Sequence, residues 1–197
     1  MAKRTFDIIF SIFGLIIFSP LLIATSLLIL ITLGRPILYS PKRTGRNRTL
    51  FTVRKFRSMR IAEGPVTHHS GDDDPRLTRV GRWIRKFKLD ELPQLWNVMK
   101  GDMSFVGPRP ETPEYTKLYT DEQKVILEFR PGITDYASIE FADLGSILSG
   151  GDPDKLYFEK VWDQKMKLRM KYVREQSFWL DLKLILMTLT AVFKRQS

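Results

Sequence analysis

The feature that most constrains this chain is a run of 26 residues, Ile8 to Leu33, that contains no charged side chain. A helix needs about 20 apolar residues to cross the hydrocarbon core of a bilayer, so the run is long enough to lie in a membrane. A cleaved signal peptide fits less well, because the run is too long and no small-x-small cleavage site follows it. The sequence therefore predicts an N-terminal membrane segment.

A Ser-Pro pair, Ser19-Pro20, lies near the middle of this run. Proline removes one backbone donor and clashes with the carbonyl four residues earlier, so we expect a helix break at which Ser19 offers its hydroxyl to the freed carbonyl. Basic residues flank both ends of the run, Lys3 and Arg4 before it and Arg35 after it, and such residues favour the cytoplasmic side. A broken helix that re-enters one leaflet satisfies both flanks, and a proline-kinked span is the alternative.

The rest of the chain predicts one domain. No repeat or low-complexity tract interrupts it, and 197 residues suffice for a single core. We therefore divide the chain into a membrane segment over residues 1–34 and a compact domain over 35–197. The fold class that we expect is α+β and mainly helical, with amphipathic interfacial helices and a few short strands.

Charge narrows the choice of partners. The chain has 32 Lys and Arg against 22 Asp and Glu, a net charge of +10, which favours nucleic acid, anionic lipid or phosphorylated small molecules. The absence of cysteine excludes disulfides, thiolate catalysis and cysteine-bound zinc. A loop with His68, His69 and Asp72 to Asp74 is a poor metal candidate, because consecutive loop residues seldom converge on one ion.

The stretch from Arg35 to Lys88 contains two basic segments, 35–60 and 77–88, that also carry aromatic residues. Its first part predicts strands at 37–39 and 50–56 around a turn at Thr44-Gly45, with Lys55 and Arg57 on one strand face as phosphate candidates. Residues 77–88 predict a basic amphipathic helix that carries Trp83 and suits a membrane interface, although a nucleic-acid surface has the same pattern. Residues 177–195 predict an interfacial or core helix that does not span.

Two adjacent carboxylates, Asp90 and Glu91, precede Pro93 and a predicted helix from Gln94 to Met99. Asp90 stands where a helix N-cap belongs, so a purely structural role as a helix cap would explain this residue. The pair also follows a cluster of cations, and phosphoryl transfer uses an anionic nucleophile or magnesium ligand beside cationic phosphate clamps. A membrane-tethered nucleic-acid-binding module or a scaffold stays open as the alternative, and a glycosidase fits poorly because adjacent carboxylates rarely face each other across a sugar.

Several segments, in this order along the chain, look like the bacterial sugar transferase family, the small monotopic polyprenyl-phosphate phosphoglycosyl transferases. The segments are KRTFDIIFSIFGLIIFSP at the start, KFRSM at 55–59, DPRLTRVGRWIRK at 74–86, LDELPQLWNVMKGDMSFVGPRP at 89–110, RPGIT at 130–134 and SFWLDLKLILMTL at 177–189.

The resemblance implies a reaction. Family members transfer sugar-1-phosphate from a UDP-sugar to undecaprenyl phosphate at the cytosolic face of the bacterial inner membrane and release UMP, the first membrane step of O-antigen, capsule, exopolysaccharide or glycoprotein glycan synthesis. By this match Asp90 is the nucleophile that forms a phosphosugar-aspartyl intermediate, Glu91 binds Mg²⁺ with Asp90 beside it, and Arg109 holds phosphate.

The match also implies re-entry at Ser19-Pro20, anionic lipids as partners and no nucleic acid. The candidates for binding substrate phosphate are Lys55, Arg57, Arg85, Arg109 and Arg130. The identity of the sugar, the glycan pathway, the oligomeric state and the docking of downstream glycosyl transferases stay open.

Three departures from the family pattern follow the Asp-Glu pair. Asp135 and Ser138 stand at the places of a Gly and a Gln, and Arg169 stands where many members have Asp. An inserted-looking segment covers residues 140–157. Because these changes lie downstream of the Asp-Glu pair, we expect them to affect donor recognition and to leave the chemistry intact.

Overall fold

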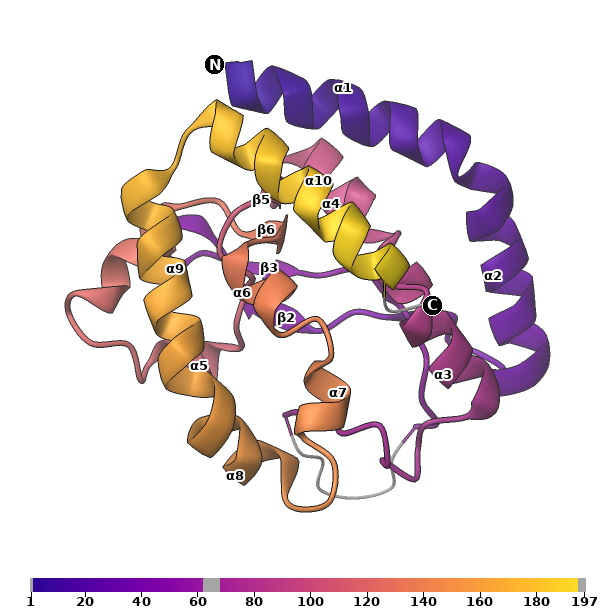
Figure 1. The fold of residues 1–197 in the computed structure, drawn as a ribbon. Helices are drawn as coiled ribbons and strands as arrows, with labels where there is room; N and C mark the ends of the chain where they lie inside the picture. Colours follow the sequence, from indigo (N-terminus) through magenta and orange to yellow (C-terminus); the bar gives the residue numbers. More distant parts are fainter. Residues whose placement is uncertain (1, 62–67, 195–197) are drawn as a thin grey trace.

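The N-terminal residues form two helices that meet at a sharp bend. This computed structural model describes residues 2–61 and 68–194, with α1 at Ala2–Ile17 and α2 at Ser19–Leu33. The two helices are bent by 60° and form an arc along one edge of the molecule (Figure 1). Within the described residues no single helix is long and apolar enough to cross a membrane, whereas the bent pair passes by length and composition.

The break follows from the chemistry of Pro20. Proline has no amide hydrogen, so the carbonyl of Ile16, four residues earlier, loses its helical donor. The Ser19 hydroxyl donates to that carbonyl at 2.7 Å. The predicted break at Ser19-Pro20 and the predicted role of the serine hydroxyl are both confirmed.

Burial on this helix pair is the reverse of that on a helix in a water-soluble protein. Asp7, Ser11 and Thr25 are buried against the rest of the chain, and Asp7 accepts hydrogen bonds from Ser104 Oγ and Phe105 N, both at 3.1 Å. The exposed large apolar residues of the pair are Ile9, Phe10, Ile12, Phe13, Ile16, Ile17, Phe18, Leu21, Ile23, Leu27, Leu30 and Ile31. The pair therefore presents a largely apolar outer surface and buries three of its polar side chains, together with Ile29.

In the part of the chain that the structure describes, six short strands form three two-stranded pairs. The antiparallel pairs are β1 (Leu38–Tyr39) with β4 (Lys55–Phe56), and β2 (Lys42–Thr44) with β3 (Leu50–Thr52); β5 (Ser104–Val106) and β6 (Gly132–Thr134) are parallel. The expected strand at 37–39 and the turn after Thr44 are confirmed. The expected strand at 50–56 is divided in two, because β3 ends at Thr52 and β4 begins at Lys55. Val53 and Arg54 lie between these strands, which pair with β2 and β1 respectively.

The remaining elements are helices or helical turns. They are η1 (Arg46–Arg48), α3 (Arg79–Lys86), η2 (Leu89–Glu91), α4 (Gln94–Lys100), α5 (Pro113–Thr116), η3 (Gln123–Glu128), α6 (Tyr136–Glu140), α7 (Leu144–Ile147), α8 (Pro153–Tyr157), η4 (Phe158–Trp162), α9 (Asp163–Glu175) and α10 (Phe178–Lys194). The predicted α+β class with mainly helical content is confirmed, as is the helix after Pro93.

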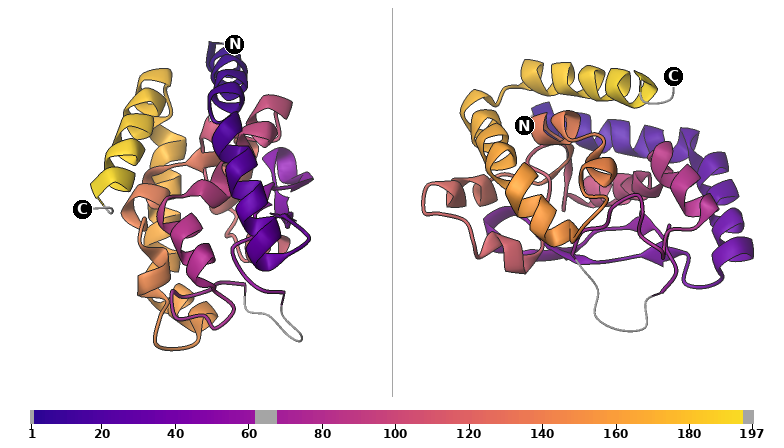
Figure 2. Two further views of the ribbon diagram at one scale, coloured as in Figure 1. Left: turned by 90° about the vertical axis from the view of Figure 1, so that its right-hand side faces the viewer. Right: turned by 60° about the horizontal axis from the view of Figure 1, so that its bottom comes forward.

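Helix α10 lies beside α1 in each view of the ribbon (Figures 1 and 2). The rings of Phe6 and Phe178 meet edge to face with centroids 5.7 Å apart, and Lys3 forms an ion pair with Asp181. Leu184 is fully buried while Trp179 is 77% exposed. Helix α10 therefore has one core face and one exposed apolar face.

The predicted basic helix after Leu77 is α3, which Thr78 caps by accepting a hydrogen bond from the Gly81 amide at 3.0 Å. Ile84 is fully buried and Trp83 is 48% exposed. These exposures confirm that the helix is amphipathic, with its aromatic residue on the outer side.

Strands β5 and β6 approach each other closely at two glycines. A Cβ atom at Gly107 would lie 2.3 Å from the Arg130 carbonyl oxygen, and one at Gly132 would lie 2.1 Å from the Gly107 nitrogen. Only glycine fits at such an approach. This contact brings the segment that carries Arg109 next to the segment that carries Asp135.

Candidate active site

Asp90 and Glu91 lie in the short turn η2, between α3 and α4. The turn begins after Lys88, whose φ of 55° is left-handed, and α4 begins after Pro93 with no side-chain cap. Asp90 therefore does not cap α4, and the interpretation of Asp90 as a helix cap is wrong. Its carboxylate is available for another role.

Glu91 is held by two cations from distant parts of the sequence. Arg109 donates from Nη1 to Glu91 Oε2 at 3.0 Å and from Nη2 to Oε1, and it also donates to the Ile133 carbonyl at 2.9 Å. Lys55 Nζ lies 3.4 Å from Oε1. The fold thus brings Lys55, Glu91 and Arg109 together, as the sequence predicted for one site.

Asp90 differs from its neighbour in its surroundings. Its Oδ1 is buried and has no hydrogen-bond partner within the part of the chain that the structure describes. Burial raises the pKa of Asp90, the charge of Glu91 raises it further, and Lys55 opposes both. Burial also acts to raise the pKa of Glu91, but Arg109 and Lys55 hold that pKa well below its usual range. Glu91 is therefore a fixed anion, and Asp90 has an oxygen with no partner.

Arg85 is another of the predicted phosphate ligands. Arg85 makes its contacts with neutral groups, Ser58 Oγ at 2.9 Å, Ser70 Oγ at 3.1 Å and Met59 Sδ at 3.3 Å. Its charge lowers the pKa of Asp90, so it acts on the site electrostatically. Arg85 thus remains a candidate for binding phosphate.

Arg57 makes its contacts away from Asp90 and Glu91. Arg57 is buried and donates to the carbonyls of Leu33 and Gly34 at 2.6 and 2.7 Å, so it closes the end of α2. Strand β4 ends at Phe56, and the expectation that Lys55 and Arg57 share one strand face is wrong. Burial lowers the pKa of Arg130, and the charges of Arg4 and Arg46 lower it further.

Arg43, which was not among the predicted site residues, adds to the positive charge near Lys55 and Arg109. Burial lowers the pKa of this β2 residue and of Lys55; Arg109 lowers the pKa of Arg43 further, and Arg43 lowers the pKa of Lys55 further. The described hydrogen bond of Arg43 is to the Lys42 carbonyl at 3.0 Å, a neutral partner. Arg43 is one of several basic residues between positions 35 and 60, and the density of charge alone did not distinguish it from its neighbours.

The donor set fits a magnesium ion that takes most of its ligands from a substrate. Mg²⁺ is usually bound through one or two carboxylates together with phosphate oxygens and water. Asp90 Oδ1 supplies one such oxygen, whereas both Glu91 oxygens are bound by Arg109. Within residues 2–61 and 68–194, no group of three or more acidic or histidine side chains is placed to hold a metal by itself.

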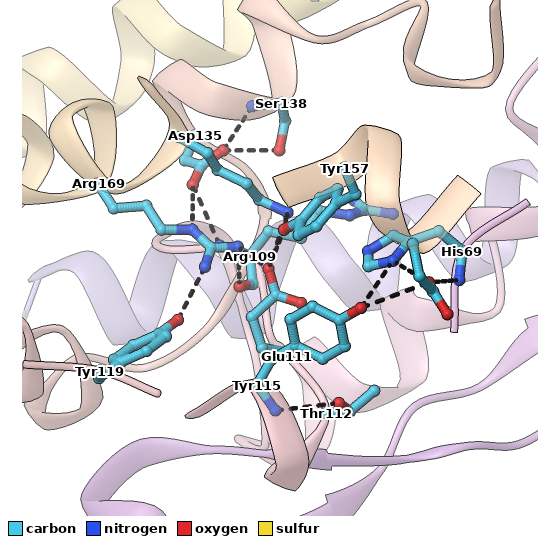
Figure 3. Close-up of polar contacts among 12 residues, drawn as sticks. His69, Arg109, Glu111, Thr112, Tyr115, Tyr119, Asp135, Ser138, Tyr157 and Arg169 are labelled. Atoms are coloured by element: carbon cyan, nitrogen blue, oxygen red, sulfur yellow. Dashed lines mark hydrogen bonds and ion pairs between the residues drawn. The ribbon is translucent and has the colours of Figure 1, made fainter. Parts of the chain in front are cut away.

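A buried polar network lies directly behind Arg109 (Figure 3). Its centre is Glu111, which contacts Lys165 Nζ at 2.8 Å, Arg169 Nη2 at 2.9 Å and the Tyr157 hydroxyl at 3.0 Å. Burial acts to raise the pKa of Glu111, but Lys165 and Arg169 hold it far below its usual range. Arg169 stands out in the sequence as a departure from the family pattern, but its contact with Glu111 was not predicted.

The loop that carries His69 joins this network from the other side. His69 Nδ1 lies 2.9 Å from Asp154 Oδ1 and 3.2 Å from the Tyr115 hydroxyl, and its ring stacks on Tyr157 with centroids 3.7 Å apart. Asp74 binds Arg76 at 2.6 Å. Residues 62–67, directly before the predicted loop of His68, His69 and Asp72 to Asp74, lie outside the described residues.

Comparisons with known proteins agree with the resemblance seen in the motifs. The family model for bacterial sugar transferase matches residues 1–195. EpsL of Bacillus subtilis, named an uncharacterized sugar transferase, is 38% identical over 96% of this chain and 86% of its own length. The UDP-glucose:undecaprenyl-phosphate glucose-1-phosphate transferase of Caulobacter vibrioides is 33% identical over 98% of this chain and 70% of its own length.

Another relative is considerably longer than this chain. The galactosyl transferase CpsE of Streptococcus agalactiae is 38% identical over 98% of this chain, which spans only 42% of the length of CpsE. These relatives are named as sugar transferases, and the alternative of a nucleic-acid-binding module or scaffold has no support from them.

Proposed function

The chain belongs to the bacterial sugar transferase family, and from this premise we propose that it transfers a sugar-1-phosphate from a UDP-sugar to undecaprenyl phosphate. Relatives that it matches over nearly its whole length are named for transfer to undecaprenyl phosphate. The observation that carries the proposal is the difference in surroundings between the two adjacent carboxylates. Glu91 is bound by Arg109 and Lys55, and Asp90 has a buried oxygen that finds no partner among the described residues.

The proposed reaction has two displacements at phosphorus. An oxygen of the Asp90 carboxylate attacks the β-phosphorus of the UDP-sugar, the bond from that phosphorus to the bridging oxygen breaks, and UMP leaves. A phosphate oxygen of undecaprenyl phosphate then attacks the same phosphorus, which breaks the bond to Asp90 and restores the carboxylate. Covalent catalysis of this kind lets a soluble donor and a lipid acceptor use one site in turn.

The cations around the pair suit the charge of the diphosphate. Arg109 and Lys55 are held next to the nucleophile by Glu91, and Arg85 carries a positive charge with neutral partners. Arginine binds phosphate oxygens through paired hydrogen bonds. When bound, Mg²⁺ would be held by Glu91 with Asp90 beside it, and it would neutralise charge that develops on the phosphate oxygens.

The membrane location is part of the proposal. The α1–α2 pair is bent, buries Asp7, Ser11 and Thr25, and exposes apolar residues along its outer side. A bilayer is the environment in which such an outer surface is stable. We place the pair in one leaflet as a re-entrant segment, with residues 35–197 on the cytosolic face of the bacterial inner membrane.

The test is release of UMP from a panel of UDP-sugars by the protein in nanodiscs that contain Mg²⁺ and undecaprenyl phosphate. We expect release with one or a few sugars, no release by Asp90→Asn, and unchanged release by Asp121→Asn, which alters an exposed acid that pairs with Lys124. Equal activity of Asp90→Asn and the native chain would remove Asp90 as the nucleophile. A folded, membrane-bound protein that releases no UMP from any sugar would overturn the proposed donor class.

A further inference from the structure

The backbone around Arg109 has little freedom of its own. Pro108 and Pro110 lie on either side of Arg109. The ring of each proline fixes its own φ, and a residue before proline is excluded from part of the backbone map. The direction of the Arg109 side chain therefore depends on how the two peptide planes that flank its Cα atom are held.

Each of these planes is held by one charged side chain (Figure 3). The Arg109 amide donates to Asp135 Oδ2 at 3.2 Å, and the Arg109 carbonyl accepts from Arg169 Nη2 at 2.7 Å. The two holding groups lie close to each other, because Arg169 Nε is 3.9 Å from Asp135 Oδ2. One ion pair thus binds both sides of the Arg109 backbone.

The holding groups are themselves fixed. Asp135 Oδ1 accepts from the Ser138 amide at 2.7 Å and from the Ser138 hydroxyl at 2.6 Å, the contacts that cap α6. Arg169 is fully buried, and its Nη1 donates to the Tyr119 hydroxyl at 2.8 Å. Neither side chain can leave Arg109 without breaking another contact.

The need to neutralise the charge of Glu111 does not explain why Arg169 is buried beside it. Lys165 already lies 2.8 Å from Glu111, and the Tyr157 hydroxyl adds a hydrogen bond at 3.0 Å. A buried arginine is costly unless its donors are used. Lys165 and Arg169 stand one turn apart on α9 and contact the same Glu111 oxygen, but of the two only Arg169 has a described bond to Arg109. Lys165 is therefore a matched control.

We propose that Arg169 and Asp135 are positioning residues, which fix the Arg109 backbone so that its guanidinium faces Glu91 and the substrate phosphate. This role in catalysis rests on the proposed transferase function. Both positions depart from the family pattern, with an acid in place of Gly at 135 and a base in place of the frequent Asp at 169. The two departures are explained together, since the new acid and the new base contact each other and the same residue.

The first test measures the backbone itself and needs no activity. Hydrogen exchange of the Arg109 amide, followed by mass spectrometry with residue-level fragmentation, should accelerate about tenfold in Arg169→Lys and Asp135→Asn. Lysine keeps the charge near Glu111 but has no planar fork to reach several acceptors. Exchange should change less than about twofold in Lys165→Met and in Ser138→Ala, which weakens only the cap of α6.

The second test measures catalysis at equal folded fraction. We expect kcat/KM for UMP release to fall about tenfold in Arg169→Lys and less than about twofold in Lys165→Met. Because Arg169 acts through Arg109, the double variant Arg109→Lys/Arg169→Lys should be no slower than Arg109→Lys alone.

Two results would overturn the positioning role: unchanged exchange of the Arg109 amide in Arg169→Lys, or equal losses of kcat/KM in Arg169→Lys and Lys165→Met. A native protein that shows the expected exchange pattern but releases no UMP would refute the proposed function and leave the hold on Arg109 intact.

Discussion

Arg109 binds Glu91 through both of its terminal nitrogens, although 18 residues separate the two in the chain. A bidentate arginine contact fixes direction as well as charge, because the guanidinium is a rigid planar fork. Glu91 thus sets the position of the arginine next to Asp90. The arrangement leads to a direct prediction about charge-conserving substitution.

Arg109→Lys should lower kcat/KM for UMP release by about 10- to 100-fold, since a lost charge-assisted hydrogen bond costs ~1.5–3 kcal/mol. Lysine keeps the positive charge, so the loss reports geometry. Arg46→Lys is the control, because Arg46 donates to the Glu128 carbonyl and has no described contact with Asp90 or Glu91. Full activity of Arg109→Lys would show that charge alone suffices at this position.

The pH profile of activity should have an acid limb whose position depends on Lys55. Asp90 must be ionised to attack phosphorus, and its pKa lies above the ordinary value of 3.8 because of burial and Glu91. Lys55 opposes that rise, so Lys55→Met should move the acid limb of kcat/KM to higher pH. Lys86→Met removes an exposed cation from α3 and should leave the limb in place. The measurement is a pH profile of UMP release, and a limb that does not move would contradict the electrostatic role of Lys55.

Stability should fall in acid because of Glu111. Its folded-state pKa is depressed by Lys165 and Arg169 below the ordinary value of 4.5. The ionised carboxylate therefore contributes stability above about pH 4.5 that is lost as the pH falls towards the folded-state pKa. Urea denaturation between pH 3 and 7 should show this loss in the native chain.

Glu111→Gln should flatten that acid dependence and destabilise the protein at pH 7 by about 3–5 kcal/mol, because two buried cations lose their partner. Glu140→Gln, which changes an exposed acid, should do neither. An unaltered acid limb in Glu111→Gln would mean that other carboxylates account for it.

The bend at Pro20 should decide the topology of the N-terminal segment. The chain has no cysteine, so single cysteines at Ala2 and Ser40 can report the side of the membrane without background labelling. In inverted vesicles a membrane-impermeant maleimide should label both positions. In Pro20→Ala, which restores the missing donor to the Ile16 carbonyl, we expect protection of one of the two sites. Protection of either position in the native chain would contradict re-entry.

Local chemistry explains what the sequence determined about this protein. The break at Ser19-Pro20 depends on one missing amide, and the helix after Pro93 depends on a proline that begins it, so both were predictable from neighbouring residues. Asp90 and Glu91 are consecutive in the chain, so their proximity does not depend on tertiary structure. The apolar length of residues 8–33 and the amphipathic period of α3 likewise follow from the order of side chains.

Tertiary structure decided which of many similar side chains form the site. Lys55 and Arg57 are two residues apart, yet Lys55 reaches Glu91 while Arg57 closes the end of α2. Asp135 and Arg169, seen in the sequence only as separate departures, meet at Arg109. Periodicity and turn residues describe local backbone structure, whereas these contacts depend on how distant segments pack, here on the close approach of Gly107 and Gly132.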